Sequence, residues 1–178
     1  TTQSVRDAAG SLLETRDGKG ALTLGAFDPL RRPTNLWARD ADGQPVTLCE
    51  LLTYGESIVN AAAANLRTRL YEHRDEADIL RFEQYDFKGN AAEKVRTVIA
   101  DAPLVATNDL FRVDWASGRE PPLDTQQYRT SVAYDALNRI RELHEPADVA
   151  GNRATLTPQY NRGGALERIS LDGSPYVA

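Results

Sequence analysis

One short pattern recurs along this chain and limits what the chain can fold into. An apolar or aromatic residue precedes an aspartate, two variable residues follow, a turn-forming residue comes next, and polar and apolar residues then alternate. An aspartate in the first position of a type I turn accepts hydrogen bonds from the backbone amides ahead of it. Three residues later the backbone needs a positive φ to rejoin the returning strand, which favours glycine or asparagine. The pattern therefore predicts β-hairpins.

Seven copies of the pattern occur in the 178 residues, and we take their key residues as repeat-turn and stacking residues. The clear copies carry Phe27 and Asp28; Tyr85, Asp86 and Gly89; and Tyr134, Asp135 and Asn138. Looser copies begin at Asp7, Asp40, Asp75 and Asn161, the last with Tyr160 before it and Gly164 after it. Arg31 stands where glycine or asparagine is favoured, so we expect strain or another geometry in that turn.

The sequences beside the turns read as strands. Arg129–Tyr134 leads into one turn, and Ile140–His144 leaves it with apolar and polar residues alternating. A lone hairpin is marginal in water, so we expect the hairpins to pair one after another. The predicted fold class is all-β: consecutive antiparallel β-hairpins in a curved, twisted sheet. We expect the tyrosine before each aspartate to stack across strands or on its counterpart in the next repeat, which contributes about 0.5–1.5 kcal/mol beyond burial.

Two stretches interrupt the series of hairpins. Residues 57–67 are rich in alanine and contain no glycine or proline, which predicts a short helix. Residues 101–124 contain three prolines and a glycine, which predicts a long surface loop. We interpret residues 1–178 as a single repeat segment. Strand-like sequence runs close to both ends, so we expect the segment to belong to a much larger chain.

Charge and composition narrow the range of partners. The formal net charge is −5 and both signs are interspersed without a basic stripe, so nucleic acid is not an expected partner. No apolar stretch approaches the roughly 20 residues of a membrane-spanning helix, so we expect no membrane span in this segment. The single cysteine, Cys49, lies in an apolar run and is expected to be buried. Exposed sheet edges predict either an edge-to-edge homodimer of the isolated segment or edges capped by its own loops.

The residue pattern predicts neither an enzyme nor a cofactor or metal site. His73 and His144 lie on different predicted hairpins, and neither has a second histidine or a cysteine near it in sequence, as a zinc site would need. Turn capping explains the aspartates with one mechanism, so we do not expect them to be catalytic. Trp37 and Trp115 leave one alternative open, which is a cell-surface or glycan-binding module with an aromatic-lined groove.

The aromatic–aspartate turns resemble YD repeats, which RHS proteins and the insecticidal toxin-complex (Tc) family share. The resemblance extends to an ordered series of landmarks: Leu70–Ala77, Tyr85–Asn90, Asp114–Trp115, Tyr134–Arg139 and Tyr160–Glu167. It spans nearly the whole chain and is strongest from residue 65 to residue 167. A single copy would be weak evidence, whereas an ordered series is specific.

This resemblance implies a structural role. In the B and C components of that family, the YD strands wind into a hollow shell that encloses a cytotoxic C-terminal segment and sits on a translocation pore. We therefore expect a shell segment whose partners are the rest of the shell, the enclosed toxin domain and the other toxin-complex components. The expected location is that of a secreted or translocated bacterial protein. The family's auto-cleavage core has no match in this sequence, so no cleavage activity is implied.

Overall fold

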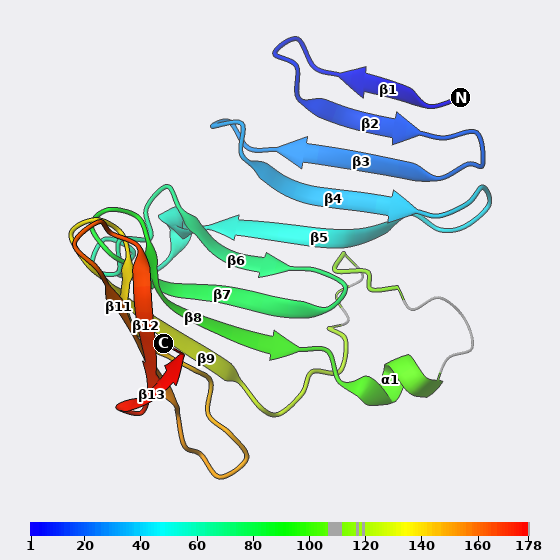
Figure 1. The fold of residues 1–178 in the computed structure, drawn as a ribbon. Helices are drawn as coiled ribbons and strands as arrows, with labels where there is room; N and C mark the ends of the chain where they lie inside the picture. The colour runs from blue at the N-terminus through cyan, green and yellow to red at the C-terminus, as the bar shows by residue number, and fades with distance from the viewer. Residues whose placement is uncertain (107–111, 117, 119, 178) are drawn as a thin grey trace. The chain divides into compact units, whose positions relative to one another are not determined.

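The computed structural model describes residues 1–106, 112–116, 118 and 120–177. These residues form 13 strands whose order in the sheet is their order in the sequence, each strand antiparallel to the one before it (Figure 1). The predicted all-β fold of consecutive antiparallel hairpins is therefore confirmed. No helix among the described residues is long and apolar enough to cross a membrane.

The strand boundaries follow the predicted turns closely. The strands are β1 (Gln3–Arg6), β2 (Leu12–Arg16), β3 (Leu22–Phe27), β4 (Pro33–Arg39), β5 (Thr47–Tyr54), β6 (Leu70–Arg74), β7 (Asp78–Tyr85), β8 (Ala91–Val98), β9 (Tyr128–Tyr134), β10 (Ile140–His144), β11 (Thr155–Tyr160), β12 (Leu166–Leu171) and β13 (Ser174–Val177). Two short helical elements, η1 (Gly55–Ser57) and α1 (Asp101–Ala106), lie between strands.

The chain divides into two compact units. The first unit contains Thr1–Thr53, Glu72–Ile79 and Val98–Asp124. The second unit contains Tyr54–Tyr71, Leu80–Thr97 and Thr125–Ala178. Each unit has its own buried residues, and we describe the two separately.

In the first unit, a row of apolar side chains crosses three neighbouring strands. Leu24 on β3 lies opposite Trp37 on β4, and Trp37 lies opposite Leu48 on β5. Directly opposed residues of antiparallel strands share one face of a sheet and contact each other there. Leu48 is only 5% exposed, so this row forms part of the core of the unit.

The predicted surface loop at residues 101–124 begins with helix α1, and residues 107–111, 117 and 119 of it lie outside the described residues. Its described part around Trp115 lies along strand β5 of the first unit. The Trp115 backbone N–H donates to the Leu48 carbonyl (3.0 Å), and the Leu48 N–H donates to Oδ1 of Asp114 (3.0 Å). Asp114 and Trp115 thereby satisfy both backbone groups of Leu48.

In the second unit, residues 58–66 form consecutive turns instead of the predicted helix at 57–67. The Ala61 and Ala63 amides each donate to the carbonyl three residues earlier, and Asn60 and Asn65 have positive φ angles of 62° and 54°. Left-handed residues end a right-handed helix. The chain folds back because Ala61 and Leu66 bury themselves against Tyr85, and this cluster is the core of the unit.

Two glycines at equivalent positions of different turns allow a matched test of the fold. Gly10 and Gly20 both have positive φ, 92° and 87°. A Cβ on Gly10 would meet nothing within 4 Å, whereas one on Gly20 would lie 2.5 Å from the Asp42 backbone nitrogen. We predict that Gly10→Ala costs about 1–2 kcal/mol from backbone strain. Gly20→Ala should cost at least about 1 kcal/mol more from overpacking.

Urea denaturation of the two variants measures this difference. Equal losses would show that the backbone near Asp42 can move away without cost, contrary to the tight packing of the turn.

Candidate functional site

Among the described residues, seven turns share one hydrogen-bonding arrangement. They begin at Asp7, Asp17, Asp28, Asp86, Asp135, Asp148 and Asn161. In each turn the N–H of the first residue donates to the carbonyl four residues later, at 2.8–3.1 Å, and the N–H three residues later donates back to the first carbonyl, at 2.8–3.3 Å. The side-chain Oδ1 of the first residue accepts the N–H four residues later, at 2.8–3.0 Å. The aspartate or asparagine thus holds the whole turn together.

The structure places five of the seven predicted copies in this arrangement, namely those at Asp7, Asp28, Asp86, Asp135 and Asn161. The Asp75 turn is shorter, because the Asp75 N–H donates to the Asp78 carbonyl three residues later (3.0 Å). The copy at Asp40 also differs, because the side chain of Gln44 accepts the Asp40 N–H and the Asp40 carboxylate binds Arg112. These two copies do not have the repeated geometry.

Sequence reasoning missed the turns at Asp17 and Asp148. Both have the aspartate and, three residues later, a glycine with positive φ, namely Gly20 and Gly151. Neither has an aromatic residue before the aspartate, but Asp7, which follows Arg6, was predicted without one. The spacing of aspartate and glycine alone would have found them.

Arg31 occupies the positive-φ position of the Asp28 turn, with φ 65°. Its guanidinium Nη2 lies 3.1 Å from Oδ2 of Asp7, at the neighbouring turn, and also donates to the Ser11 hydroxyl. Ion pairs exposed to solvent stabilise a protein only weakly. These contacts offset part of the strain that the sequence predicted for this residue.

The fifth residue of several turns binds the second carboxylate oxygen. Nε of Arg139 donates to Oδ2 of Asp135 (2.7 Å), and Nδ2 of Asn90 donates to Oδ2 of Asp86 (2.8 Å). The backbone N–H of Arg139, followed by its side chain, holds the pKa of Asp135 below its usual value. Asp135 therefore stays ionised and fully engaged in its turn, which is unsuited to a general acid.

The tyrosines before the turns connect neighbouring hairpins through their hydroxyls. The hydroxyl of Tyr85 donates to the Leu70 carbonyl (2.7 Å), that of Tyr134 to the Ala91 carbonyl (3.3 Å) and that of Tyr160 to the Ile140 carbonyl (3.0 Å). The three acceptors are the first residues of β6, β8 and β10. Each tyrosine therefore fastens the end of its strand to the start of the strand before it.

The prediction that each repeat tyrosine stacks across strands or on its counterpart in the next repeat stays a prediction, and other contacts of these rings are observed. The Tyr85 ring stacks on Phe82 of its own strand, with centroids 5.6 Å apart. The faces of two repeat tyrosines carry guanidinium groups, with Arg69 5.1 Å from the Tyr85 centroid and Arg139 4.5 Å from the Tyr160 centroid. Such cation–π contacts contribute about 0.5–1 kcal/mol at exposed sites.

Polar contacts also join the tips of consecutive turns in the second unit. Lys88 Nζ donates to the Ala136 carbonyl, and Nδ2 of Asn90 donates to Oδ1 of Asn138 (3.1 Å). Arg139 binds Asp135 in its own turn and covers Tyr160 of the next hairpin. The turns at Asp86, Asp135 and Asn161 thus form a connected series, which we call the turn ladder.

Phe27 stands where the later repeats carry tyrosine. It is half-buried at the end of β3, where it pairs with Pro33. A phenylalanine has no hydroxyl to donate, so this copy lacks the bond that joins the hairpins of the turn ladder. In the first unit, the ion pair between Arg31 and Asp7 links neighbouring turns instead.

The two tryptophans that the sequence suggested for glycan binding both lie in the first unit. The Trp115 indole N–H donates to the Asp75 carbonyl (3.2 Å), and the Arg74 guanidinium lies 5.3 Å from the Trp115 centroid. Trp37 is half-buried within β4. The glycan-binding alternative, which needs an aromatic-lined groove with Trp37 or Trp115, stays a prediction.

Each of the two histidines lies beside a carboxylate, and the cysteine is buried. His73 Nε2 lies 3.2 Å from Glu50, and His144 Nε2 lies 2.8 Å from Glu142. Within the part of the chain that the structure describes, no group of three or more potential ligands could hold a metal ion. Cys49 is 5% exposed, and burial raises the pKa of its thiol, which makes it a poor nucleophile.

The sequence matches no protein-family model and no curated protein. The fold is similar to that of solved toxin-complex proteins. A crystal structure of TcdB2-TccC3 has a TM-score of 0.78 and 16% identity over 96% of this chain. A Photorhabdus luminescens Tc holotoxin pore with a mutated TccC3 has a TM-score of 0.77 and 17% identity over 97% of this chain. The chain spans 8% of the length of each, and likeness at this identity shows the fold alone.

The tyrosine hydroxyls give a direct test of the turn ladder. We predict that Tyr134→Phe and Tyr160→Phe each lower the free energy of unfolding by about 1 kcal/mol, because each loses one hydrogen bond between hairpins. Tyr176→Phe is the matched control, because Tyr176 is 66% exposed on β13. Its effect should stay within about 0.5 kcal/mol. If all three variants lose the same stability, the hydroxyls do not join the hairpins.

The turn aspartates predict a loss of stability in acid. The pKa values of Asp135 and Asp148 are lowered from 3.8, first by the backbone N–H of Arg139 and of Asn152. The unfolded chain therefore binds protons at a higher pH than the folded chain does. The stabilisation is present above about pH 4 and is lost as the pH falls through the lower pKa values of the folded state.

Asparagine can replace the aspartate, as Asn161 shows in its own turn. The double variant Asp135→Asn/Asp148→Asn should therefore lose less stability than the wild type between pH 5 and pH 2 in thermal melts. Glu167→Gln, which removes an exposed carboxylate from β12, should leave the acid profile unchanged. An unchanged profile in the double variant would argue against the turn aspartates as the acid-sensitive groups.

Proposed function

We propose that this chain is a structural segment of the β-shell that encapsulates the cytotoxic C-terminal part of a bacterial toxin of the RHS/Tc type before its translocation. The turn ladder is the observation that carries the proposal. Its tyrosine hydroxyls donate to backbone carbonyls of the preceding strand, and Arg139, held by Asp135 in its own turn, covers Tyr160 of the next hairpin. Such an arrangement can be repeated many times without a new core. Similarity to solved toxin-complex folds over 96% of the chain supports it.

The chemistry of the repeated residues supports a structural role over a catalytic one. Both carboxylate oxygens of Asp86 and Asp135 accept hydrogen bonds within their own turns. Burial raises the pKa values of Tyr85 and Tyr134, so their hydroxyls keep the protons that they donate to neighbouring strands. A group that is held in a single structural contact is poorly placed to exchange protons with a substrate.

In the proposed shell, further strands would pair with the two outer strands of this chain. Strands β1 and β13 lie at the two ends of the strand order, and all their residues are exposed. Exposed strand edges pair readily with further strands. In the parent protein these would come from the rest of the shell, and in the isolated chain from a second copy. Analytical ultracentrifugation of the isolated chain tests the second pairing, which a strictly monomeric chain would contradict.

The test of the proposed function is limited proteolysis of the full-length protein that contains these residues. A shell predicts that the segment downstream of the repeats resists protease in the native protein and is digested once the protein is unfolded. The double variant Tyr134→Phe/Tyr160→Phe should increase digestion of that segment, with Tyr176→Phe as the control. Digestion of the downstream segment at the same rate in the native and unfolded protein would overturn the encapsulation proposal.

A further inference from the structure

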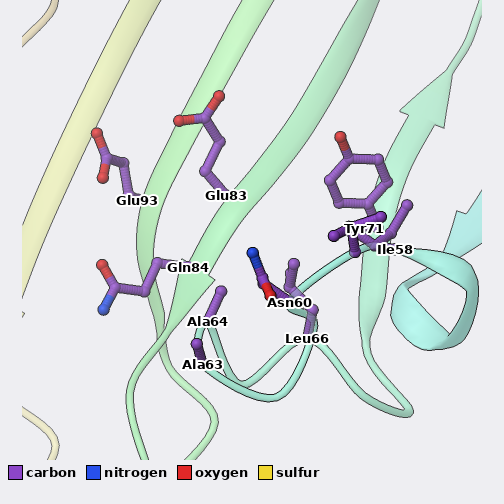
Figure 2. Close-up of a pocket in the computed structure, with 10 residues that line it drawn as sticks. Ile58, Asn60, Ala63, Ala64, Leu66, Tyr71, Glu83, Gln84 and Glu93 are labelled. Carbon is purple, nitrogen blue, oxygen red and sulfur yellow. The ribbon is translucent and has the colours of Figure 1, made fainter.

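The second unit contains an open pocket of about 440 Å³ that the turn ladder does not use. Figure 2 shows Glu83, Gln84 and Glu93 projecting from neighbouring strands on one side of the pocket. The turns between β5 and β6 form the opposite side. Pockets of roughly 300–1,000 Å³ are typical of ligand sites, so the size permits a bound side chain with its adjoining backbone.

The wall formed by the turns is aliphatic. It consists of Ile58, Val59, Ala63, Ala64 and Leu66, with Tyr71 of β6 beside them. Val59 is 86% exposed at this wall, which leaves an apolar side chain without cover in the isolated chain. Burying a Val- or Leu-sized side chain from a partner would contribute about 1.5–3 kcal/mol.

The strand wall is acidic and has unused hydrogen-bonding capacity. Arg129 Nη1 donates to Oε2 of Glu83 and to Oε1 of Glu93, so one guanidinium serves two carboxylates. Among the described residues, the other oxygen of each carboxylate has no protein partner. The two carboxylates of the lining share the one positive charge of Arg129, which leaves one negative charge of the group unbalanced. A cation brought in by a partner would therefore meet complementary charge.

Two side-chain amides complete the lining. Gln84 and Asn60 each present one donor pair and one acceptor, and among the described residues neither side chain has a protein partner. An amide side chain matches the donor and acceptor of a peptide backbone. The Tyr71 ring already carries the Arg81 guanidinium at 5.8 Å, which makes it a poor platform for a sugar. The lining therefore favours a peptide over a glycan.

We propose that this pocket binds a peptide segment in which an aliphatic side chain stands next to a lysine or arginine. The aliphatic side chain lies against the wall of Ile58, Ala63 and Leu66, and the cation binds the carboxylate oxygens of Glu83 and Glu93 that do not contact Arg129. The amides of Gln84 and Asn60 bind the peptide backbone. This site does not depend on the proposed shell function, because it is built only from side chains of the second unit.

The test uses short fluorescein-labelled peptides and the 178-residue chain in fluorescence polarisation. The first probe peptide contains leucine next to arginine, the second leucine next to glutamate, and the third serine next to arginine. The proposal predicts that the first peptide binds at least about tenfold more tightly than either of the others. Binding should weaken as salt is added, because the cation contributes through charge.

Two neighbouring alanines supply a matched pair of variants. Ala63 and Ala62 are both exposed, but only Ala63 lines the pocket. Ala63→Trp should fill the pocket and abolish binding of the leucine–arginine peptide, whereas Ala62→Trp should bind as the wild type does. Glu93→Gln should weaken binding severalfold, and the control Glu167→Gln should not. Thermal melts establish that each variant is folded.

Failure of the leucine–arginine peptide to bind would overturn the proposal, and so would binding that survives in Ala63→Trp. A glycan array provides the remaining outcome. Binding of a glycan that Ala63→Trp abolishes, without peptide binding, would assign the pocket to a sugar and also overturn the peptide proposal. None of these outcomes bears on protease protection in the full-length protein, so the two proposals can fail separately.

Discussion

The structure depends on one contact, in which an aspartate or asparagine side chain accepts the backbone N–H four residues later. This contact fixes the length of the turn, and the length of the turn fixes which residues of the two strands face each other. A slip of one residue would turn every side chain of a strand to the opposite face. Because the same contact recurs in seven turns of the described residues, the register of each of those hairpins is set by residues within its own turn.

Contacts between hairpins are then small and numerous. Among the described residues, no large side chain is less than 2% exposed. This part of the chain therefore has no deep core that could hold the hairpins together. A tyrosine hydroxyl bond contributes about 1 kcal/mol and a guanidinium on an aromatic ring about 0.5–1 kcal/mol. Each is weak, yet both recur with the turns. Arg139 links one turn to the next hairpin, because it binds Asp135 in its own turn and covers the ring of Tyr160.

The sequence predicts well those features that residues close to one another in the chain determine. The spacing from Asp86 to Gly89 predicts a turn because both requirements, a side-chain acceptor and a positive φ, lie within four residues. Distant residues decide the rest. The Asp40 carboxylate binds Arg112, 72 positions away, instead of the backbone of its own turn. The alanine-rich stretch forms turns because they allow Leu66 to be buried against Tyr85. The acceptor of each tyrosine hydroxyl also depends on strand register, which no single motif encodes.

The pocket in the second unit shows how an interruption can add function to a repeat. Short turns of five residues leave the faces of neighbouring strands open, with no wall to enclose a ligand. The connection between β5 and β6 is longer, and its turns bring Asn60 and Ala63 opposite Glu83 and Glu93 (Figure 2). A regular helix there would lack the left-handed backbone at Asn60 and Asn65 that lets the chain fold back on Tyr85. The departure from the predicted helix and the existence of the pocket therefore have the same physical cause.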